Sequence, residues 1–512
     1  MFNILKRMTH STSISCCTQM GTSYEEAIKA LCLTLQNNAA YLQSVQQHKV
    51  NDPKKLEDTK KFLLRSGITL EQLDKLSFIH VAGTKGKGST CAIMEIILRH
   101  QGFSTGFFSS PHLVSVRERI RINGEPISQS YFAHSFWKVY RRLEQNREDE
   151  SDMPTYFKFL TILMFHVFLE ANVDVAIVEV GIGGELDCTN ILRNPVCVGV
   201  TSLGLEHTLL LGNTLEKIAQ QKSGIFKPNA VAFTVPQAES AMCVLQKRAI
   251  ERCCRSLKIV STTQNQEWNK IFSSVGMITD VQQLNASLSI HMALEWMKSR
   301  YNKQSSLIMD NRCIDTSFSS EHQNDKNELF KEKESIFLEK VAVALANYKW
   351  PGRAQILKTS TADFFLDGAH TVESIVHCIS WFKKTSRNSS RKYLIFNTTG
   401  NRDSLKLLKL LVPLDFDRAY FTPNYAGVAH VENLLNCSKL INNQEKKYKE
   451  HCEQWGKGSV LKNSVAEVLD DIKSYALSQT DDKVEVLVTG SLHLVGALLT
   501  ILDPNLTMTS DF

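Results

Sequence analysis

Hydrophobic residues recur along this chain with two periods that alternate. From Tyr24 to about Leu76, apolar side chains return every three or four residues among charged ones, a spacing that predicts helices. Phe78–Ala82 is a short apolar run and predicts a buried strand, and Thr90–Arg99 follows a helical period again. Strands alternating with helices indicate a parallel sheet covered by helices. Two more strands are predicted, at Val173–Val180 and Val196–Ser202.

The same alternation returns in the last third of the chain. Phe364–Asp367 ends a predicted strand, and further strands are predicted at Lys392–Asn397, Arg418–Phe421 and Val484–Thr489. These patterns predict an α/β protein with two α/β domains, residues 24–350 and 351–512.

Between the two patterns lies a polar and charged stretch, residues 299–335. Its composition predicts a mobile insertion or linker within the first domain. A helix is expected to follow at Ile336–Tyr348, and Trp350–Arg353 marks a turn near the domain boundary.

Composition narrows the class of protein. The chain has 512 residues, 43% of them hydrophobic, which suits a globular protein of two or three domains at roughly 100–200 residues each. Its 59 basic and 53 acidic residues leave a net charge of +6, too weak to predict nucleic-acid binding. No apolar run reaches the roughly 20 residues of a membrane span, so stable membrane insertion is not expected. The 13 cysteines lack zinc-type pairs, which favours reduced thiols.

The first residues have a composition of their own. Residues 1–23 include Lys6, Arg7 and many serines and threonines but no acidic residue. This suits a mitochondrial transit peptide, and a disordered tail fits equally well. Met8 and Met20 offer internal starts that would give a cytosolic form, so both mitochondrial and cytoplasmic locations are expected.

A glycine-rich loop, Gly83–Ser89, connects the first predicted strand to the next helix. Consecutive backbone N–H groups in such a loop, with the positive end of a helix behind them, bind phosphates. Lys87 would supply a point charge. Because Gly88 separates Lys87 from Ser89, the loop departs from the usual pattern, and the metal-binding hydroxyl is better sought at Ser110.

Several other polar residues follow predicted strands, where open α/β sheets bind ligands. Glu179 ends an apolar strand, and a Mg²⁺ ion or a structural salt bridge would offset the cost of burying it. Ser110 and His207 are either metal ligands or ordinary turn residues. Lys222 contacts phosphate, is chemically modified, or is simply a solvated lysine.

The second domain adds three candidates of this kind. Asp367 could hold a ribose or the adenine edge, and Arg353 could reach phosphates with its fork of donors. His370 could orient a substrate.

Together these motifs resemble a known family. In order and spacing they are similar to the folylpolyglutamate synthases, ATP-dependent amide ligases related to the Mur ligases. The resemblance covers about Tyr24 to Leu502, apart from the insertion. It implies a P-loop-containing, Mur ligase-like parallel-sheet domain and a smaller, Rossmann-like α/β C-terminal domain. The stretches that carry it are His80–Thr90, Thr105–Ile127, Val178–Asn190, Gln221–Lys227, Trp350–Arg353, Leu366–Thr371 and Val488–Val495.

The resemblance also implies roles for individual residues. ATP phosphates would be bound by Gly86, Lys87, Gly88 and Ser89, and Mg²⁺ by Ser110, Glu179 and His207. Across the cleft, Arg353 and Asp367 would contact ATP, and Asn285 matches a residue near the adenine. Lys222 matches a lysine that is carbamylated in relatives, and with Lys87 and His370 it completes the expected catalytic set. K⁺ or another monovalent cation is a further expected cofactor.

The implied reaction joins L-glutamate to the γ-carboxylate of a reduced folate through an acyl phosphate, at the expense of ATP. A monomer acting on these small molecules is expected. The alternatives are a bifunctional dihydrofolate and folylpolyglutamate synthase, a nucleotide-binding relative without ligase activity, and a Mur-type ligase. Two departures from the family pattern are Glu206 in place of aspartate and Val281 in place of histidine. Positive potential for polyglutamate tails is expected from Arg117, Arg119 and Arg121.

Overall fold

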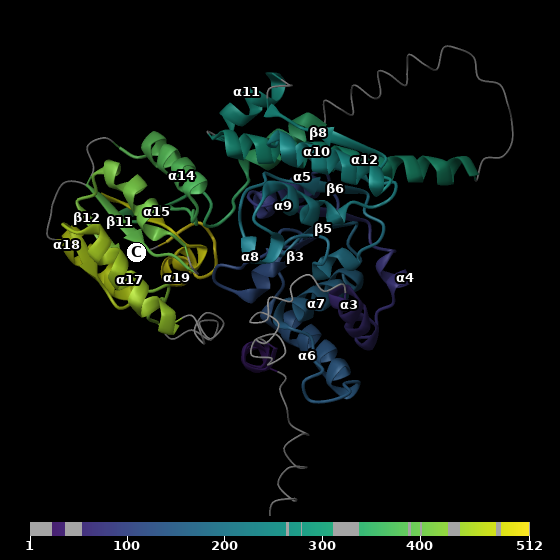
Figure 1. Ribbon diagram of the computed structural model, residues 1–512, viewed down its shortest axis with the longest axis horizontal. Coiled ribbons are helices and arrows are strands. Elements are labelled where there is room, and N and C mark those ends of the chain that lie inside the picture. The colour runs from purple at the N-terminus through teal and green to yellow at the C-terminus, as the bar shows by residue number, and fades with distance from the viewer. Residues whose placement is uncertain are drawn as a thin grey trace, which may run out of the picture.

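The computed structural model describes residues 23–35, 54–262, 266–277, 279–310, 337–387, 391–399, 402–428, 441–477, 483–510 and 512. The expected transit peptide or tail, residues 1–23, therefore lies outside the described residues except for Ser23. Two sheets, each with helices on both faces, lie side by side (Figure 1). Within the described parts, no helix has the length and apolar character needed to cross a membrane.

The first sheet has eight strands in the order β4-β3-β2-β5-β1-β6-β7-β8. All pair in parallel except β3 and β4, which form an antiparallel edge beside β2. Their bounds are β1 Phe78–Ala82, β2 Thr105–Phe108, β3 Ile120–Ile122, β4 Glu125–Pro126, β5 Val175–Glu179, β6 Cys197–Val200, β7 Val231–Thr234 and β8 Ser256–Ile259.

Buried residues of β1 alternate between two hydrophobic clusters. Phe78 packs with residues of α6 and α7, whereas Ile79 and Val81 pack with α5 and α12 on the other face. This explains why β1 is a continuous apolar run, since both faces are covered. The helices around this sheet are α1 Tyr24–Ala30, α3 Lys54–Arg65, α4 Leu70–Leu73, α5 Lys87–His100, α6 Gln129–Gln145, α7 Tyr156–Glu170, α8 Thr208–Leu211, α9 Leu215–Lys222, α10 Glu239–Glu251, α11 Gln266–Ser274 and α12 Asp280–Asp310.

The second sheet has six strands in the order β13-β12-β11-β14-β10-β9, with only β9 antiparallel. Its strands are β9 Gln355–Lys358, β10 Ala362–Leu366, β11 Lys392–Phe396, β12 Arg418–Phe421, β13 Ser459–Leu461 and β14 Val484–Thr489. Its helices are α14 Val372–Thr385, α15 Ser404–Leu411, α17 Ile441–Trp455, α18 Val465–Leu477 and α19 Leu492–Leu502.

One loop of the first unit enters the core of the second. After β2 the chain turns, and Leu113 and Val114 are buried in the hydrophobic cluster of the second sheet. Gly496 in α19 permits this approach, because a Cβ there would lie 2.3 Å from the carbonyl oxygen of Leu113. The carboxylate of Glu118 holds the loop by accepting hydrogen bonds from the backbone N–H groups of residues 113–115, at 2.6–3.0 Å.

Most of residues 299–335 was predicted to be a mobile insertion or linker, and the described part of this stretch is helical. Residues 299–310 continue α12 as a helix, because the apolar spacing that begins at Asp280 commits the segment to helix before its polar end is reached. Residues 311–335 lie outside the described residues. Residues 337–346 are helical, within the helix predicted at Ile336–Tyr348.

Candidate active site

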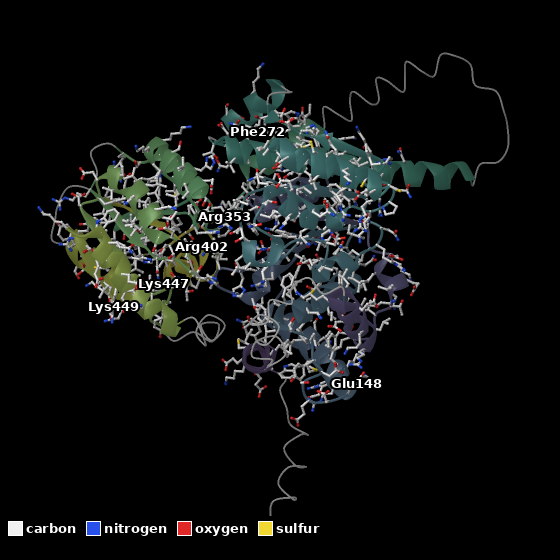
Figure 2. All side chains as sticks on the ribbon, in the orientation of Figure 1. Glu148, Phe272, Arg353, Arg402, Lys447 and Lys449 are labelled. Carbon is white, nitrogen blue, oxygen red and sulfur yellow. The ribbon has the colours of Figure 1, made fainter. Side chains whose placement is uncertain are left out.

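A cavity of about 1600 Å³ lies between the two sheets, and the loops after β1, β2, β5, β6 and β10 contribute to its walls. Sites for one small ligand typically measure about 300–1,000 Å³, so this cavity has room for more than one substrate. Figure 2 places Arg353 and Arg402 on the side of the second unit that faces the first. Of the residues predicted from sequence, the cavity is lined by Gly86, Lys87, Gly88, Ser89, Ser110, Glu179, His207, Asn285, Arg353, Asp367 and His370.

The glycine-rich loop forms one wall. Gly86 has φ 88°, the left-handed conformation that glycine adopts without strain, and immediately precedes α5. No side chain caps this helix, so its first N–H groups remain available to an anion. A Cβ on Gly86 would lie 2.4 Å from Oδ1 of Asn285, so the amide of α12 lies directly against the loop. Lys87 stands in the first turn, and the helix starts three residues earlier than predicted.

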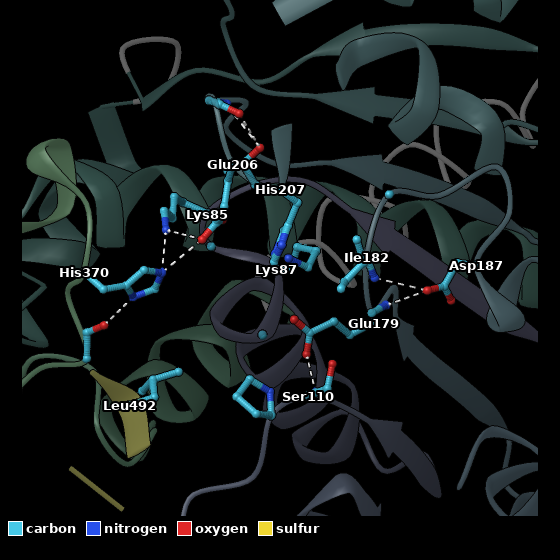
Figure 3. A pocket seen from close by; sticks show the side chains of 18 of the residues that line it. Lys85, Lys87, Ser110, Glu179, Ile182, Asp187, Glu206, His207, His370 and Leu492 are labelled. Atoms are coloured by element: carbon cyan, nitrogen blue, oxygen red, sulfur yellow. Dashed lines mark hydrogen bonds and ion pairs between the residues drawn. The ribbon is translucent and has the colours of Figure 1, made fainter. Parts of the chain in front are cut away.

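Glu179, at the end of β5, is 3% exposed. Its Oε2 accepts a hydrogen bond from the backbone N–H of Ser110 at 2.9 Å (Figure 3). Burial raises its pKa, while Lys87, this hydrogen bond and more distant arginines act in the opposite direction. A Cβ on Gly88 would lie 3.4 Å from Oε2, so the glycine keeps the carboxylate close to the phosphate loop. A buried carboxylate with so little hydrogen bonding is chemically suited to a cation.

The other two predicted metal ligands lie on the same cavity. Burial lowers the pKa of His207, which favours the neutral imidazole that a metal requires. Among the described residues, no three His, Cys, Asp or Glu side chains gather as a ready metal cluster. Ser110, Glu179 and His207 present oxygen and nitrogen donors to one cavity, and a Mg²⁺ ion held there would need phosphate oxygens and water to complete its shell.

Asp367, after β10, forms part of the opposite wall. Its Oδ2 accepts from the N–H of Ala354 at 2.8 Å and its Oδ1 from the N–H of Ala369 at 2.9 Å. Burial raises the pKa of Asp367, and Arg353 is the largest influence in the other direction. The carboxylate thus joins two turns of the second unit and fixes the backbone that carries Arg353.

His370 connects the two units. Its Nδ1 lies 2.7 Å from the carbonyl oxygen of Gly368, and its Nε2 lies 3.0 Å from Oε1 of Glu206 and 3.0 Å from Nζ of Lys85 (Figure 3). Lys85 and Glu206 belong to the first unit and are themselves 3.2 Å apart. Burial lowers the pKa of His370, and its contact with Glu206 opposes that effect.

Comparison with known proteins identifies the family. Residues 352–501 match the family described as dihydrofolate synthetase, C-terminal domain. The chain is 39% identical to the mitochondrial folylpolyglutamate synthase of Bos taurus, over 94% of this chain and 93% of that protein. It is 34% identical to a folylpolyglutamate synthase of Saccharomyces cerevisiae, over 94% and 88%. The chain belongs to the folylpolyglutamate synthase family.

Solved structures of folylpolyglutamate synthases share this fold. E. coli FolC in complex with DHPP and ADP has a TM-score of 0.64 at 23% identity, covering 94% of this chain and 99% of that chain. The apo form of the L. casei enzyme has a TM-score of 0.65 at 22% identity, over 93% and 98%. The Mur ligase-like α/β fold expected from the motifs is confirmed, as is the family.

The structure separates Lys222 from the other residues expected at the folylpolyglutamate synthase site. Lys222 is 4% exposed, is not among the residues lining the cavity, and donates a hydrogen bond from Nζ to the carbonyl oxygen of Gly83 at 2.7 Å. Burial, reinforced by Lys87, lowers its pKa to about 7. It therefore supports the phosphate loop from behind, with an amine that is easily neutralised.

The three arginines proposed to attract polyglutamate tails do not all face the cavity. Arg119 lines the cavity, whereas Arg117 donates to the carbonyl oxygen of Ile127 and Arg121 to those of Glu118 and Gly124. Arg117 and Arg119 lie in a short 3-10 helix, Val116–Arg119, and Arg121 lies in β3, so the three side chains reach different surroundings that the spacing alone did not reveal. Of the two departures, Val281 lines the cavity without a polar group, and Glu206 reaches His370.

Sequence reasoning missed three cavity residues that carry chemistry. Lys85 lies inside the glycine loop, two residues before Lys87, and that position was the available signal. Arg402, after β11, donates from one NH group to the carbonyl and hydroxyl oxygens of Thr399, both at 2.7 Å. His493, at the start of α19, has its pKa lowered by burial to about 4. The last two follow strands that the sequence did predict.

Proposed function

We propose that this protein is an ATP-dependent ligase that adds L-glutamate to the γ-carboxylate of tetrahydrofolate and its polyglutamates through an acyl phosphate. The observation that carries the proposal is one cavity with the uncapped phosphate loop and Glu179 on one wall and Arg353 and His370 on the other. Its relatives are named folylpolyglutamate synthases, and some solved members contain ADP or AMPPCP.

The first step would transfer the γ-phosphoryl group of ATP to the folate carboxylate. A carboxylate oxygen bonds to the γ-phosphorus, the bond to the β-phosphate oxygen breaks, and ADP leaves. Such transfer is mainly a matter of positioning and charge stabilisation. The N-terminus of α5 and Lys87 would hold the phosphates from one side and Arg353 from the other. Ser110, Glu179 and His207 would hold Mg²⁺, which neutralises phosphate charge.

The second step would join the amine of glutamate to the activated carbonyl carbon and release inorganic phosphate. The amine must lose protons, so a neutral base is needed at the site. Because the carbonyl of Gly368 can only accept, Nδ1 of His370 carries a hydrogen and Nε2 faces the cavity as the basic nitrogen. Arg402, also on the cavity wall, would bind a glutamate carboxylate.

A bifunctional enzyme that also joins glutamate to dihydropteroate is the second candidate. The matching C-terminal family is described as dihydrofolate synthetase, and one structural relative is a complex with DHPP. The two candidates share the cavity and differ only in the pterin-bearing substrate.

One assay tests both candidates. The purified protein is given ATP, Mg²⁺ and labelled glutamate, with tetrahydrofolate or dihydropteroate as acceptor. We expect folate-dependent incorporation of label and equimolar ADP release with tetrahydrofolate and little with dihydropteroate. Comparable rates with both would establish the bifunctional enzyme. Nucleotide binding without incorporation would leave only a nucleotide-binding relative.

Mammalian relatives carry the word mitochondrial in their names. We infer a mitochondrial pool of this protein, with a cytoplasmic pool from the internal starts at Met8 or Met20. Fluorescent fusions of the full chain and of chains starting at these methionines would test this. A monomer is also proposed, and sedimentation would check it.

A further inference from the structure

A contact between Lys85, Glu206 and His370 connects the two units across the cavity. Glu206 follows β6 and Lys85 belongs to the phosphate loop, while His370 comes from the second unit. The side chains of Glu206 and His370 are 19% and 18% exposed, so the contact is largely shielded from water. Shielding strengthens a polar contact that would contribute little at a surface.

Hydrogen-bond chemistry limits how these three groups are arranged. Nδ1 of His370 donates a hydrogen bond to the carbonyl oxygen of Gly368, so Nε2 carries no hydrogen in the neutral ring and can accept one. Lys85 has only donors and satisfies both Nε2 and Oε1 of Glu206, at 3.0 and 3.2 Å. When Nε2 gains a proton, the same oxygen of Glu206, 3.0 Å away, accepts it as a hydrogen bond.

One oxygen of Glu206, Oε1, reaches both Lys85 and His370, at 3.2 and 3.0 Å. The neighbouring His207 belongs to the proposed metal set, so Glu206 has two possible directions of influence: the metal side or the amine side. Among the described residues, the hydrogen bonds of its carboxylate reach His370 directly and through Lys85.

We propose that Glu206 and Lys85 are positioning residues for His370 in the amine-attack step. Before ATP binds, Lys85 bridges Nε2 and Oε1 and holds the ring across the gap between the two units, and Glu206 stabilises the imidazolium once Nε2 has taken the proton of glutamate. Lys85 is drawn toward phosphate when ATP occupies the adjacent loop, which frees Nε2 for the amine. This inference rests on the proposed function and assigns a role within its second step.

The test separates the two steps in Glu206→Gln. Rapid-quench measurement of ADP formed with ATP, Mg²⁺ and tetrahydrofolate, without glutamate, reports phosphoryl transfer. Incorporation of labelled glutamate reports the whole reaction. We expect ADP formation to stay within about threefold while incorporation falls about 10- to 100-fold, the scale of a misplaced general base. Glu206→Asp should recover part of the loss. Glu239→Gln, an exposed acid of the first unit that does not line the cavity, is the matched control and should change neither rate.

A double variant makes the assignment specific to His370. If Glu206 acts through the ring, Glu206→Gln combined with His370→Asn should be no slower than His370→Asn alone. Additive losses, or an equal fall in ADP formation and incorporation, would overturn the proposal and place Glu206 on the metal side. If the wild-type protein incorporates glutamate but forms no ADP without it, the acyl phosphate sequence fails, and this proposal with it. No incorporation by the wild type would refute the proposed function itself.

Discussion

The two sheets treat their buried carboxylates in opposite ways. Glu179 and Asp367 each follow a parallel strand, line the same cavity and have a pKa raised by burial. Asp367 receives backbone N–H donors on both oxygens, whereas Glu179 receives one. A carboxylate that the protein itself satisfies serves its architecture, and one left short of donors is prepared for a ligand.

The same contrast extends to the cations nearby. Lys87 donates no side-chain hydrogen bond to any of the described residues, although Glu179 is close enough to influence it electrostatically. Lys222, in contrast, is already committed to the carbonyl of Gly83. We expect cavity residues that lack hydrogen-bond partners among the described residues to affect activity. Residues that are hydrogen-bonded to the protein should affect stability.

The largest effect is expected from Lys87→Ala. This variant removes the positive charge expected at the phosphates from a side chain that donates no hydrogen bond to the described residues. We expect kcat/KM for glutamate ligation to fall by about three orders of magnitude or more, as for other groups that stabilise a transferring phosphoryl. Thermal unfolding should barely change. A purified variant with near-normal ligation would show that Lys87 does not act on the phosphates.

Glu179→Gln should come next. Loss of the carboxylate should lower kcat about 10²- to 10³-fold and raise the Mg²⁺ concentration needed for half-maximal activity. Because the buried charge is unfavourable in the empty site, Tm should stay the same or rise. The readouts are a Mg²⁺ titration of activity and a melting curve, and a strongly destabilised variant would contradict the ligand-directed role.

Asp367→Asn should show the reverse pattern. The oxygen of asparagine can accept from only one of the two backbone N–H groups. The other N–H group would face the NH₂ group, and these two facing donors would be unsatisfied at a cost of about 1–3 kcal/mol. We therefore expect a lower Tm and denaturant midpoint, with a loss of kcat in the folded protein smaller than that of Glu179→Gln. Asp363→Asn, on β10 and outside the cavity, serves as a comparison for strand-end charge loss. If Asp367→Asn abolished activity without changing stability, Asp367 would not differ from Glu179 in its role.

Lys222 gives the smallest expected effect, and it depends on pH. Burial lowers its pKa from 10.5 to about 7, so between these values the unfolded chain binds a proton that the folded protein does not. Stability should therefore rise with pH across this window, and the cost of the buried charge is greatest below about pH 7. Lys222→Met should flatten the rise in Tm between pH 7 and 9. The same slope in both proteins would assign the pH dependence to other groups.

Sequence patterns predicted most interior strands of the two sheets, although β2 and β7 of the first sheet were not among them. The expected bounds of β1, β12 and β14 match the structure, because these runs are buried on both faces. Patterns failed at the edges. The antiparallel strands β3, β4 and β9 have two to four residues each and carry no period long enough to recognise.

The sequence predicted the site residues that belong to local motifs. It did not predict contacts between residues that are far apart in the chain. The cavity contains the expected loop residues, although their roles remain predictions. The contact of Lys85 with His370 joins positions 285 residues apart in the sequence, which no local spacing encodes. Lys222 was expected in the catalytic set, and its ammonium group donates to the carbonyl of Gly83 and is not part of the cavity lining.

The loop that carries Leu113 makes the second unit structurally dependent on the first. A fragment cut before Gly352 would lose two aliphatic side chains from its own interior and expose the groove beside Gly496 to water. The boundary drawn along the chain is therefore not a boundary of the hydrophobic core. The same loop begins at Ser110, whose N–H is bonded to Glu179, so residues 110–114 connect the Glu179 wall of the cavity to the core of the second unit. In this protein one loop completes the hydrophobic core of the second unit and also forms part of the cavity.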